Sequence, residues 1–247
     1  MRLRRIVIAL HDPAHMQPTL ADAAALANFV QGELAGLLIE DEDVCQFASL
    51  PFAREIVRAS GMPRALNSDT LERQLRVRAQ RIRRAFQQLE ADKRLRTSLR
   101  IVRGRRQAQA AAAELPADVF FLARRRRKPL AKPRHEYPTS RPIAPLAVYY
   151  DRSGHADRAL EVGAALQKSR LGPLLVLTEH HVDSRELPAT LTECDFRLLR
   201  VESNEGPEEL AIRHGCRLLV LPARGETGPR LMEKEVETTG LPIALVV

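Results

Sequence analysis

Short apolar runs alternate along the chain with polar turns and with longer segments of helical spacing. The two clearest runs, Ile6–Leu10 and Leu146–Tyr150, each end at polar residues, as buried parallel strands do. An Ala- and Leu-rich segment with one apolar helix face follows each run, and we expect Thr19 to cap the first of these helices. Gly32 and Gly172 stand where the two helices should end. The pattern predicts β-α-β units with parallel strands.

The remaining elements continue this alternation. Further strands are predicted at Leu34–Ile39, Leu99–Val102, Val119–Leu122, Leu174–Thr178, Phe196–Val201, Leu218–Leu221 and Pro242–Val247, and short helices at Gln107–Leu115 and Pro207–His214. A long helix is expected over Ser68–Arg94, with one apolar stripe and arginines over the rest of its surface. Two interpretations of those arginines stay open: the solvated face of an ordinary amphipathic helix, or a surface for nucleic acid.

The chain repeats itself. Sliding it by 140 positions aligns Ile6–Leu38 with Leu146–Thr178 without a gap, and a second slide of 99 positions superposes Val119–Leu122 on Leu218–Leu221. The difference of 41 residues is a segment that the second half lacks. We therefore expect an α/β fold of two doubly wound parallel-sheet domains in tandem, packed about a pseudo-twofold axis. The expected bounds are residues 1–123 for the first domain, 124–141 for an Arg-rich linker and 142–247 for the shortened second domain.

Segment lengths predict how the halves differ. Only Glu179–Asp195 lies between the second and third strands of the second half, and Pro188 interrupts it, so we expect no long helix there. The sheet face would then need covering by the other half or by a second chain. In the first half, the stretch between Leu122 and Leu146 is too short for a further helix, a strand and a linker. We expect this half to lack its fifth strand.

Composition narrows the class of protein. Hydrophobic residues make up 45% of the 247 residues, which excludes wholesale disorder, and no apolar run is long enough to cross a membrane. Aromatic residues are only 4%, with no Trp, which argues against a platform for stacking bases. Cys45, Cys194 and Cys216 share no close spacing and indicate neither a disulfide framework nor a zinc site. We expect a cytoplasmic protein.

Positive charge is concentrated in one segment. The formal charge is +8, yet residues 1–141 carry +12 and residues 142–247 carry −4. Arg124–Arg141 alone holds eight basic residues and one acid. Three interpretations stay open: a solvated linker, a salt-dependent contact with nucleic acid or anionic lipid headgroups, or an anion site formed by Arg124, Arg125, Arg126 and Arg127. The preference for Arg over Lys suits phosphate recognition, and it also arises in GC-rich genomes.

Several segments resemble the universal stress protein family. Tyr149-Tyr150-Asp151-Arg152-Ser153, followed by an Ala-rich helix, resembles the opening of those domains, where a strand ends in Asp-Gly-Ser. Ile39–Asp43 with Leu50–Glu55 looks like tandem bacterial members, Cys216–Gly225 is similar to the family's late strand and glycine loop, and Gly240–Val247 resembles its final strand. The resemblance implies a Rossmann-like, adenine nucleotide alpha hydrolase-like fold in both halves.

The resemblance also implies an ATP site, in which an acid follows the first strand and a late loop reads Gly-x2-Gly-x9-Gly-[Ser/Thr]. Asp151 holds the acid position, Gly225 and Gly228 have the first spacing, and Thr239 falls near the hydroxyl position. Thr238 replaces the last glycine, and its β-branched side chain blocks close approach of a phosphate. Four acids add repulsion; they are Glu226, Glu233, Glu235 and Glu237. These departures indicate a vestigial site.

In the first half, His11 stands at the acid position, and the run from Arg124 replaces the glycine loop. The prediction is therefore a non-enzymatic stress-response or regulatory protein with degraded nucleotide sites, no catalytic residue, no metal and no resident cofactor, which packs on itself or forms a homodimer. His180-His181 with Asp183 are expected to be solvated loop residues. One alternative is an ATP or AMP sensor using the second domain around Asp151. The other is a nucleic-acid-associated protein acting through Arg124–Arg141.

Overall fold

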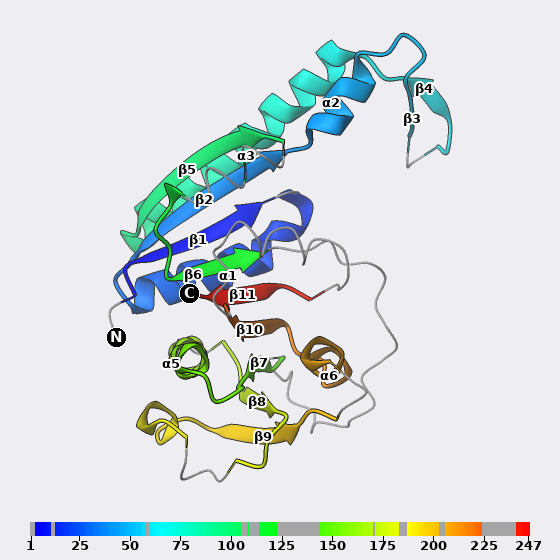
Figure 1. Cartoon of the computed structure of the whole chain (residues 1–247). Coiled ribbons are helices and arrows are strands. Elements are labelled where there is room, and N and C mark those ends of the chain that lie inside the picture. The colour runs from blue at the N-terminus through cyan, green and yellow to red at the C-terminus, as the bar shows by residue number, and fades with distance from the viewer. Residues whose placement is uncertain are drawn as a thin grey trace.

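A single sheet of nine strands runs through the described part of the chain (Figure 1). The structure is a computed structural model, and it describes residues 3–10, 13–57, 60–104, 108, 114–122, 144–169, 171–182, 187–202, 206–223 and 241–247. The strand order is β5-β2-β1-β6-β11-β10-β7-β8-β9, and neighbours are parallel except for β6 and β11. The prediction of a doubly wound α/β fold is confirmed.

The described elements that were expected lie close to their expected positions, whereas most of the expected helix Gln107–Leu115 lies outside the described residues. The first half contains β1 (Arg5–Leu10), α1 (Pro13–Phe29), β2 (Glu33–Glu40), α2 (Glu42–Ala48), β3 (Arg54–Ile56), β4 (Pro63–Ala65), α3 (Ser68–Lys93), β5 (Arg96–Arg103) and β6 (Val119–Leu122). The second half contains β7 (Leu146–Tyr149), α5 (Gly154–Lys168), β8 (Leu174–Thr178), the 3₁₀ turn η2 (Ala189–Leu191), β9 (Phe196–Arg200), α6 (Pro207–Arg213), β10 (Leu218–Pro222) and β11 (Ile243–Val246). None of the described helices is both long and apolar enough to cross a membrane.

Both halves use the same strand order. In each, the third strand lies outside the second, the second beside the first, and the fourth on the other side of the first, as β5-β2-β1-β6 and β9-β8-β7-β10. The aligned segments, residues 6–38 and 146–178, therefore adopt the same β-α-β topology, as the repeat predicts. The division of the chain into two tandem domains stays a prediction, because the halves share one continuous sheet.

The halves meet where β6 pairs with β11. Val119 lies opposite Val246 and Leu122 opposite Ile243 in this antiparallel pair. The other edge of β6 pairs with β1. With both edges occupied, β6 has no room for a fifth strand of its own half, and β11 stands in that place. The expected loss of the fifth strand is confirmed for the described residues.

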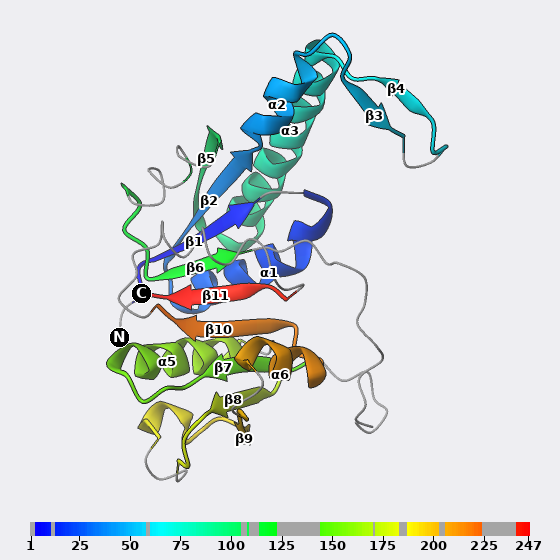
Figure 2. The ribbon, with the colours of Figure 1, turned by 45° about the vertical axis from the view of Figure 1, so that its right-hand side comes forward.

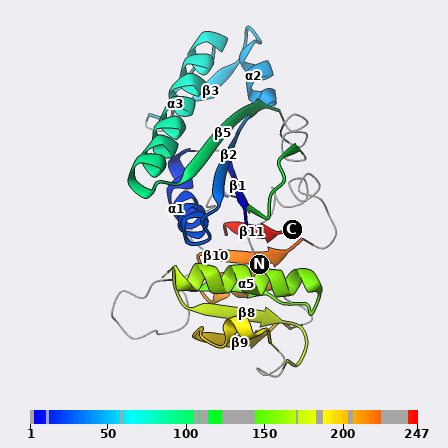
Figure 3. The same ribbon diagram turned by 90° about the vertical axis from the view of Figure 1, so that its left-hand side faces the viewer.

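Helices cover both faces of the sheet. α1, α3 and α5 pack on one face, over residues such as Ile8, Leu38 and Val148, and Figure 3 shows α1 and α3 on the same side of the strands. α6 packs on the other face through the buried residues Leu210 and Ala211. The face that each helix covers follows from right-handed crossovers between parallel strands.

One of the two local expectations about α1, the cap at its start, is wrong. Thr19 does not cap this helix, because α1 begins at Pro13 and continues through Pro18, which leaves Thr19 buried inside it. α1 ends at Phe29, close to Gly32 as expected, and the left-handed residue in the turn between them is Gln31, with φ 53°. By contrast, α3 spans nearly its expected range, with the Asn67 side chain accepting a hydrogen bond from Thr70 N at 2.7 Å.

The second half covers its own sheet face without a long helix. Within residues 179–182 and 187–195, only the η2 turn is helical, as expected. Val182, Leu187 and Leu191 are buried and join the apolar cluster above β7 and β8. The expectation that the first half or another chain must cover this face is therefore wrong, because α5 and three side chains of a loop of the same half cover it.

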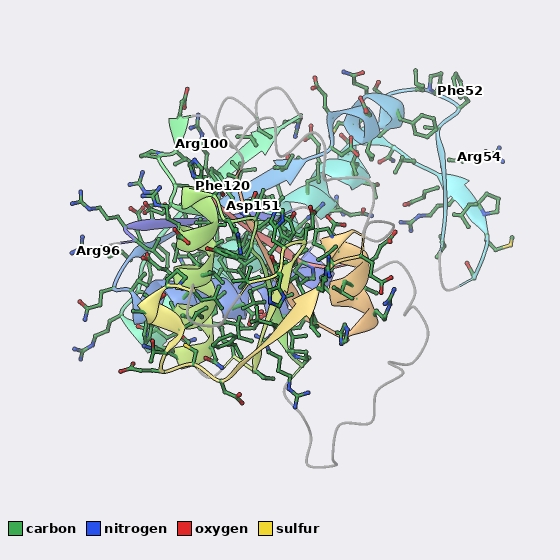
Figure 4. The ribbon with its side chains drawn as sticks, turned by 60° about the horizontal axis from the view of Figure 1, so that its bottom comes forward. Phe52, Arg54, Arg96, Arg100, Phe120 and Asp151 are labelled. Atoms are coloured by element: carbon green, nitrogen blue, oxygen red, sulfur yellow. The ribbon has the colours of Figure 1, made fainter. Side chains whose placement is uncertain are left out.

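The first half carries an arm with no counterpart in the second. α2, the β3–β4 hairpin and the beginning of α3 project beyond the sheet (Figures 1 and 2). Phe52 and Ile56 on this arm are 71% and 73% exposed. Figure 4 shows Phe52 and Arg54 far from Asp151. The arm therefore takes no part in the predicted nucleotide site.

Candidate functional site

The carboxyl ends of β7 and β10 form the place where the sequence predicts a nucleotide. These strands are parallel neighbours, with Leu146 opposite Leu218 and Val148 opposite Val220. Their carboxyl ends therefore lie at the same edge of the sheet, where open α/β sheets bind ligands. Asp151 lies two residues after the end of β7 and is partly buried.

Asp151 is part of the turn that starts α5. Its Oδ1 accepts a hydrogen bond from Ser153 N at 3.1 Å. Ser153 is the N-cap of α5, and its hydroxyl oxygen accepts from Ala156 N at 3.1 Å. The two side chains thus satisfy backbone donors at the helix start. These donors are among those that a bound anion would otherwise use.

Arg152 adopts a left-handed backbone conformation, with φ 65°. The family resemblance implies glycine at this position, which adopts that conformation without strain. The Arg152 guanidinium donates a hydrogen bond to the His181 carbonyl oxygen at 2.6 Å. Because His181 lies just after β8, this bond crosses from the end of β7 to the end of the neighbouring strand. No local pattern in the sequence predicts this bridge, although the sequence does show an arginine where the family resemblance implies glycine.

The loop after β8 is joined to β7 by a second bond. The Tyr149 hydroxyl donates to Glu179 Oε1 at 2.6 Å. His180 and His181 are exposed, as expected for loop residues. Within the part of the chain that the structure describes, no three His, Cys, Asp or Glu side chains come close enough to hold a metal ion.

The other predicted site residues lie outside the described residues. They are Gly225, Gly228 and Thr239 of the second half, Arg124, Arg125, Arg126 and Arg127 of the Arg-rich segment, and His11 of the first half. The structure therefore places Asp151 alone of this set. The described part of β10 ends at Pro222 and Ala223, and Ala223 N donates to Val246 O at 2.7 Å. The described end of β10 thus lies at the same edge of the sheet as Asp151.

A buried ion pair, not anticipated from the sequence, joins the two halves. Asp22 of α1 is 5% exposed and accepts a hydrogen bond from the guanidinium of Arg217, just before β10. Burial raises the pKa of Asp22 to about 6, while the positive charge of Arg217 acts in the opposite direction. The two residues are 195 positions apart, so local sequence patterns could not connect them.

The cysteines offer no reactive thiolate. Burial raises the pKa of the Cys216 thiol to about 12, so it is protonated at neutral pH. The pKa values of Cys45 and Cys194 are also raised, first by burial. The described thiols therefore suit packing better than nucleophilic chemistry.

Comparison with known proteins finds a structural likeness but no match in sequence. No family model and no curated protein matches the sequence. A universal stress protein from Archaeoglobus fulgidus superposes over 98% of this chain and 95% of its own, with a TM-score of 0.50 and 11% identity. The chain has the fold of a universal stress protein. The expected resemblance is thereby confirmed at the level of the fold.

Two Pseudomonas aeruginosa proteins are similar over nearly the same extent. A functionally unknown protein covers 99% of this chain and 92% of its own, with 12% identity and a TM-score of 0.44. A protein provisionally assigned as a universal stress protein covers 99% and 93%, with 11% identity and a TM-score of 0.45. At these low identities the likeness concerns architecture and does not transfer an activity.

Proposed function

We propose that this protein is a non-enzymatic regulatory protein of the universal-stress-protein type, acting in a stress response, with degraded nucleotide sites. The observation that carries the proposal is the hydrogen bond from Arg152 to the His181 carbonyl oxygen. It starts at the residue after Asp151, beside the carboxyl ends of β7 and β10 where the sequence predicts the nucleotide, and ties that turn to the loop after β8. The bond fixes an arginine at the position where the family resemblance implies glycine.

Asp151 alone is too weak a determinant to hold ATP. Its carboxylate already accepts a hydrogen bond from Ser153 N. One further hydrogen bond to a charged group contributes about 1.5–3 kcal/mol. Even a millimolar dissociation constant requires about 4 kcal/mol. The late loop supplies acids and Thr238 where glycines would present backbone donors, so little is added from that side.

Calorimetric titration with Mg-ATP tests the proposal. We expect no binding tighter than roughly 1 mM and no hydrolysis, both in the natural protein and in Asp151→Ala. Asp157→Ala is the matched control, because Asp157 is another carboxylate in the first turn of α5. Micromolar binding that Asp151→Ala abolishes and Asp157→Ala preserves would overturn the proposal in favour of an ATP or AMP sensor.

A further inference from the structure

Arginines and glutamines form a stripe along the solvent side of α3, opposite the side that packs on the sheet. The stripe recurs at spacings of three, four and seven residues, and all its members are exposed. Its members, called the basic stripe below, are Arg73, Arg76, Gln80, Arg83, Arg84 and Gln87. Ala79, Ile82 and Phe86 on the opposite side are buried. The stripe therefore faces outward because the apolar side is fixed against the sheet.

Most of this charge is not neutralised. Arg73, Arg83 and Arg84 form no hydrogen bond or ion pair with any residue that the structure describes. Arg76 lies 3.6 Å from Glu72, but both side chains are largely exposed, and such pairs are worth little. Residues 68–103 hold eleven arginines and lysines against four acids. This helix and its neighbouring strand thus carry a net charge of +7.

An open groove of about 380 Å³ runs beside the stripe, between α3 and the carboxyl ends of β2 and β5. Arg76, Gln80 and Arg83 line one side and Arg103 lies across from them. Glu40 at the base is only 8% exposed and lies 3.3 Å from the Arg103 guanidinium. Glu40 is thus paired and buried, and the exposed Glu72 also lines the groove, so its rim presents three arginines and an amide against one exposed carboxylate.

We propose that the basic stripe and this groove bind the phosphate backbone of double-stranded DNA. The stripe runs from residue 73 to residue 87 of α3, about 21 Å at 1.5 Å per residue, which exceeds the major-groove width of roughly 12 Å, so its ends can reach phosphates on both sides of the groove. Guanidinium groups bind phosphate oxygens in bidentate geometry. The contact is to phosphates, so it is independent of base sequence.

The geometry favours DNA over two other polyanions. The wide major groove of B-DNA admits an α-helix, whereas the major groove of A-form RNA is too narrow. A helix that lies in a lipid interface must turn its apolar side to the acyl chains. In α3 that side is already buried against the sheet. Figures 2 and 3 show α3 at one end of the molecule, beside β5, where a duplex can approach from outside.

Fluorescence anisotropy with a labelled DNA duplex of roughly 24 base pairs, about two helical turns, tests this proposal. The test variant carries Arg73→Gln, Arg76→Gln, Arg83→Gln and Arg84→Gln. Glutamine has nearly the helix propensity of arginine, so the variant should fold, and circular dichroism checks this. The matched control has the same charge change at four exposed arginines outside the stripe, in the changes Arg54→Gln, Arg81→Gln, Arg96→Gln and Arg200→Gln.

The test variant should bind at least tenfold more weakly at roughly 50 mM salt, and the slope of log K against log salt should fall by about 3–4. The control should stay within about threefold of the natural protein, since exposed charges farther from the bound phosphates than a Debye length, roughly 14 Å at this salt, are largely screened. Binding lost equally in both variants would overturn the proposal, as would undetectable binding by the natural protein at that salt.

Three further results would also refute it. The first is tighter binding to an RNA duplex of equal length, and the second is binding to vesicles with an anionic headgroup but not to DNA. The third is DNA binding that is lost only when four changes in the Arg-rich segment are introduced together, namely Arg124→Gln, Arg125→Gln, Arg126→Gln and Arg127→Gln. Should the fourfold stripe variant unfold, the two pairs Arg73→Gln/Arg76→Gln and Arg83→Gln/Arg84→Gln are measured separately. Each pair is expected to lower the salt slope by about 2.

Discussion

The two halves solve the same structural problem with very different lengths of chain. Between its second and third strands, the first half inserts α2, the β3–β4 hairpin and the 26-residue α3. At the same place the second half has a loop with one 3₁₀ turn. Both segments cover the same face of the sheet, and the apolar residues beneath them belong to one cluster. Covering the sheet therefore does not explain why the first segment is so long.

The additional residues of the first half's segment lie on surfaces that do not pack against the sheet. Three buried side chains suffice in the second half, namely Val182, Leu187 and Leu191. In α3 the corresponding work is done by Ala79, Ile82 and Phe86. The remainder of this segment forms the arm and the basic stripe. Surface that the core does not need is available for interactions with other molecules. The basic stripe is such a surface, and its chemistry is defined by its exposed arginines.

The largest effect is expected from removing the main apolar contact of each segment. Phe86→Ala should lower the free energy of unfolding by about 3–5 kcal/mol and Leu191→Ala by about 2–3 kcal/mol. The reason is that each deletes a buried side chain, 3% and 1% exposed respectively. Urea denaturation followed by circular dichroism measures both. Val77→Ala is the control on α3, because Val77 is 43% exposed, and it should cost less than about 0.5 kcal/mol.

If the packing of this loop on the sheet does not stabilise the second half, Leu191→Ala would leave the free energy of unfolding almost unchanged. That result would break the comparison, since the two segments would then not share a role. Two separate transitions, one sensitive to each substitution, would also count against a single continuous sheet as the unit of folding.

A smaller effect, about 3 kcal/mol in the pH-dependent free energy of unfolding, is expected from replacing Asp22 of the ion pair that joins the two halves. The pKa of Asp22 is about 6 in the folded protein against 3.8 in the reference state. Between these values the folded state binds more protons than the unfolded state, so stability falls as the pH rises from about 4 to about 6. Relative to the natural protein, Asp22→Asn should therefore gain up to about 3 kcal/mol between pH 4 and pH 7.

Denaturation of both proteins at several pH values measures this difference, in which the titration of all other groups cancels. Arg217→Met should be strongly destabilising at pH 7, because it leaves a buried carboxylate without its cation. A stability difference between the natural protein and Asp22→Asn that does not change with pH would mean that Arg217 fully offsets the burial of Asp22.

Sequence reasoning succeeded where burial leaves a local pattern. The strands β6 and β8 and the helix α3 lie at or within one residue of their expected bounds, because continuous apolar runs and a helical stripe mark buried elements. It missed α2 and the β3–β4 hairpin, which are short and mostly exposed. Such elements depend on local bonds, for example from Val44 N to the Asp41 carboxylate.

Contacts between distant parts of the chain could not be predicted from the sequence either. The pairing of β6 with β11 and the bond between Asp22 and Arg217 join residues more than a hundred positions apart. At the candidate site, the sequence identified Asp151 and the arginine after it. The left-handed conformation of Arg152 and its bond to the His181 carbonyl oxygen depend on the position of the loop after β8. That position has no signature in a single sequence.

The smallest effects concern two glycines that allow close packing, one in each half. A methyl group added at Gly36 of β2 would lie 2.5 Å from Cζ of Phe86, and one at Gly163 of α5 would meet a methyl group of Val148. We expect Gly36→Ala to destabilise by about 1–3 kcal/mol through overpacking. Gly163→Ala should cost about 1 kcal/mol less, because alanine is favoured over glycine by that amount inside a helix.

Double-mutant cycles separate the two contacts. Phe86→Leu should recover at least about 1 kcal/mol of the cost of Gly36→Ala, since the shorter side chain frees the space that the new methyl group occupies. Val148→Ala should do the same for Gly163→Ala. The crossed pairs, Phe86→Leu with Gly163→Ala and Val148→Ala with Gly36→Ala, should be additive, because they lie in different halves. Recovery in a crossed pair would show that the two packing sites are coupled through the shared sheet, and the two halves could then no longer be compared as independent solutions.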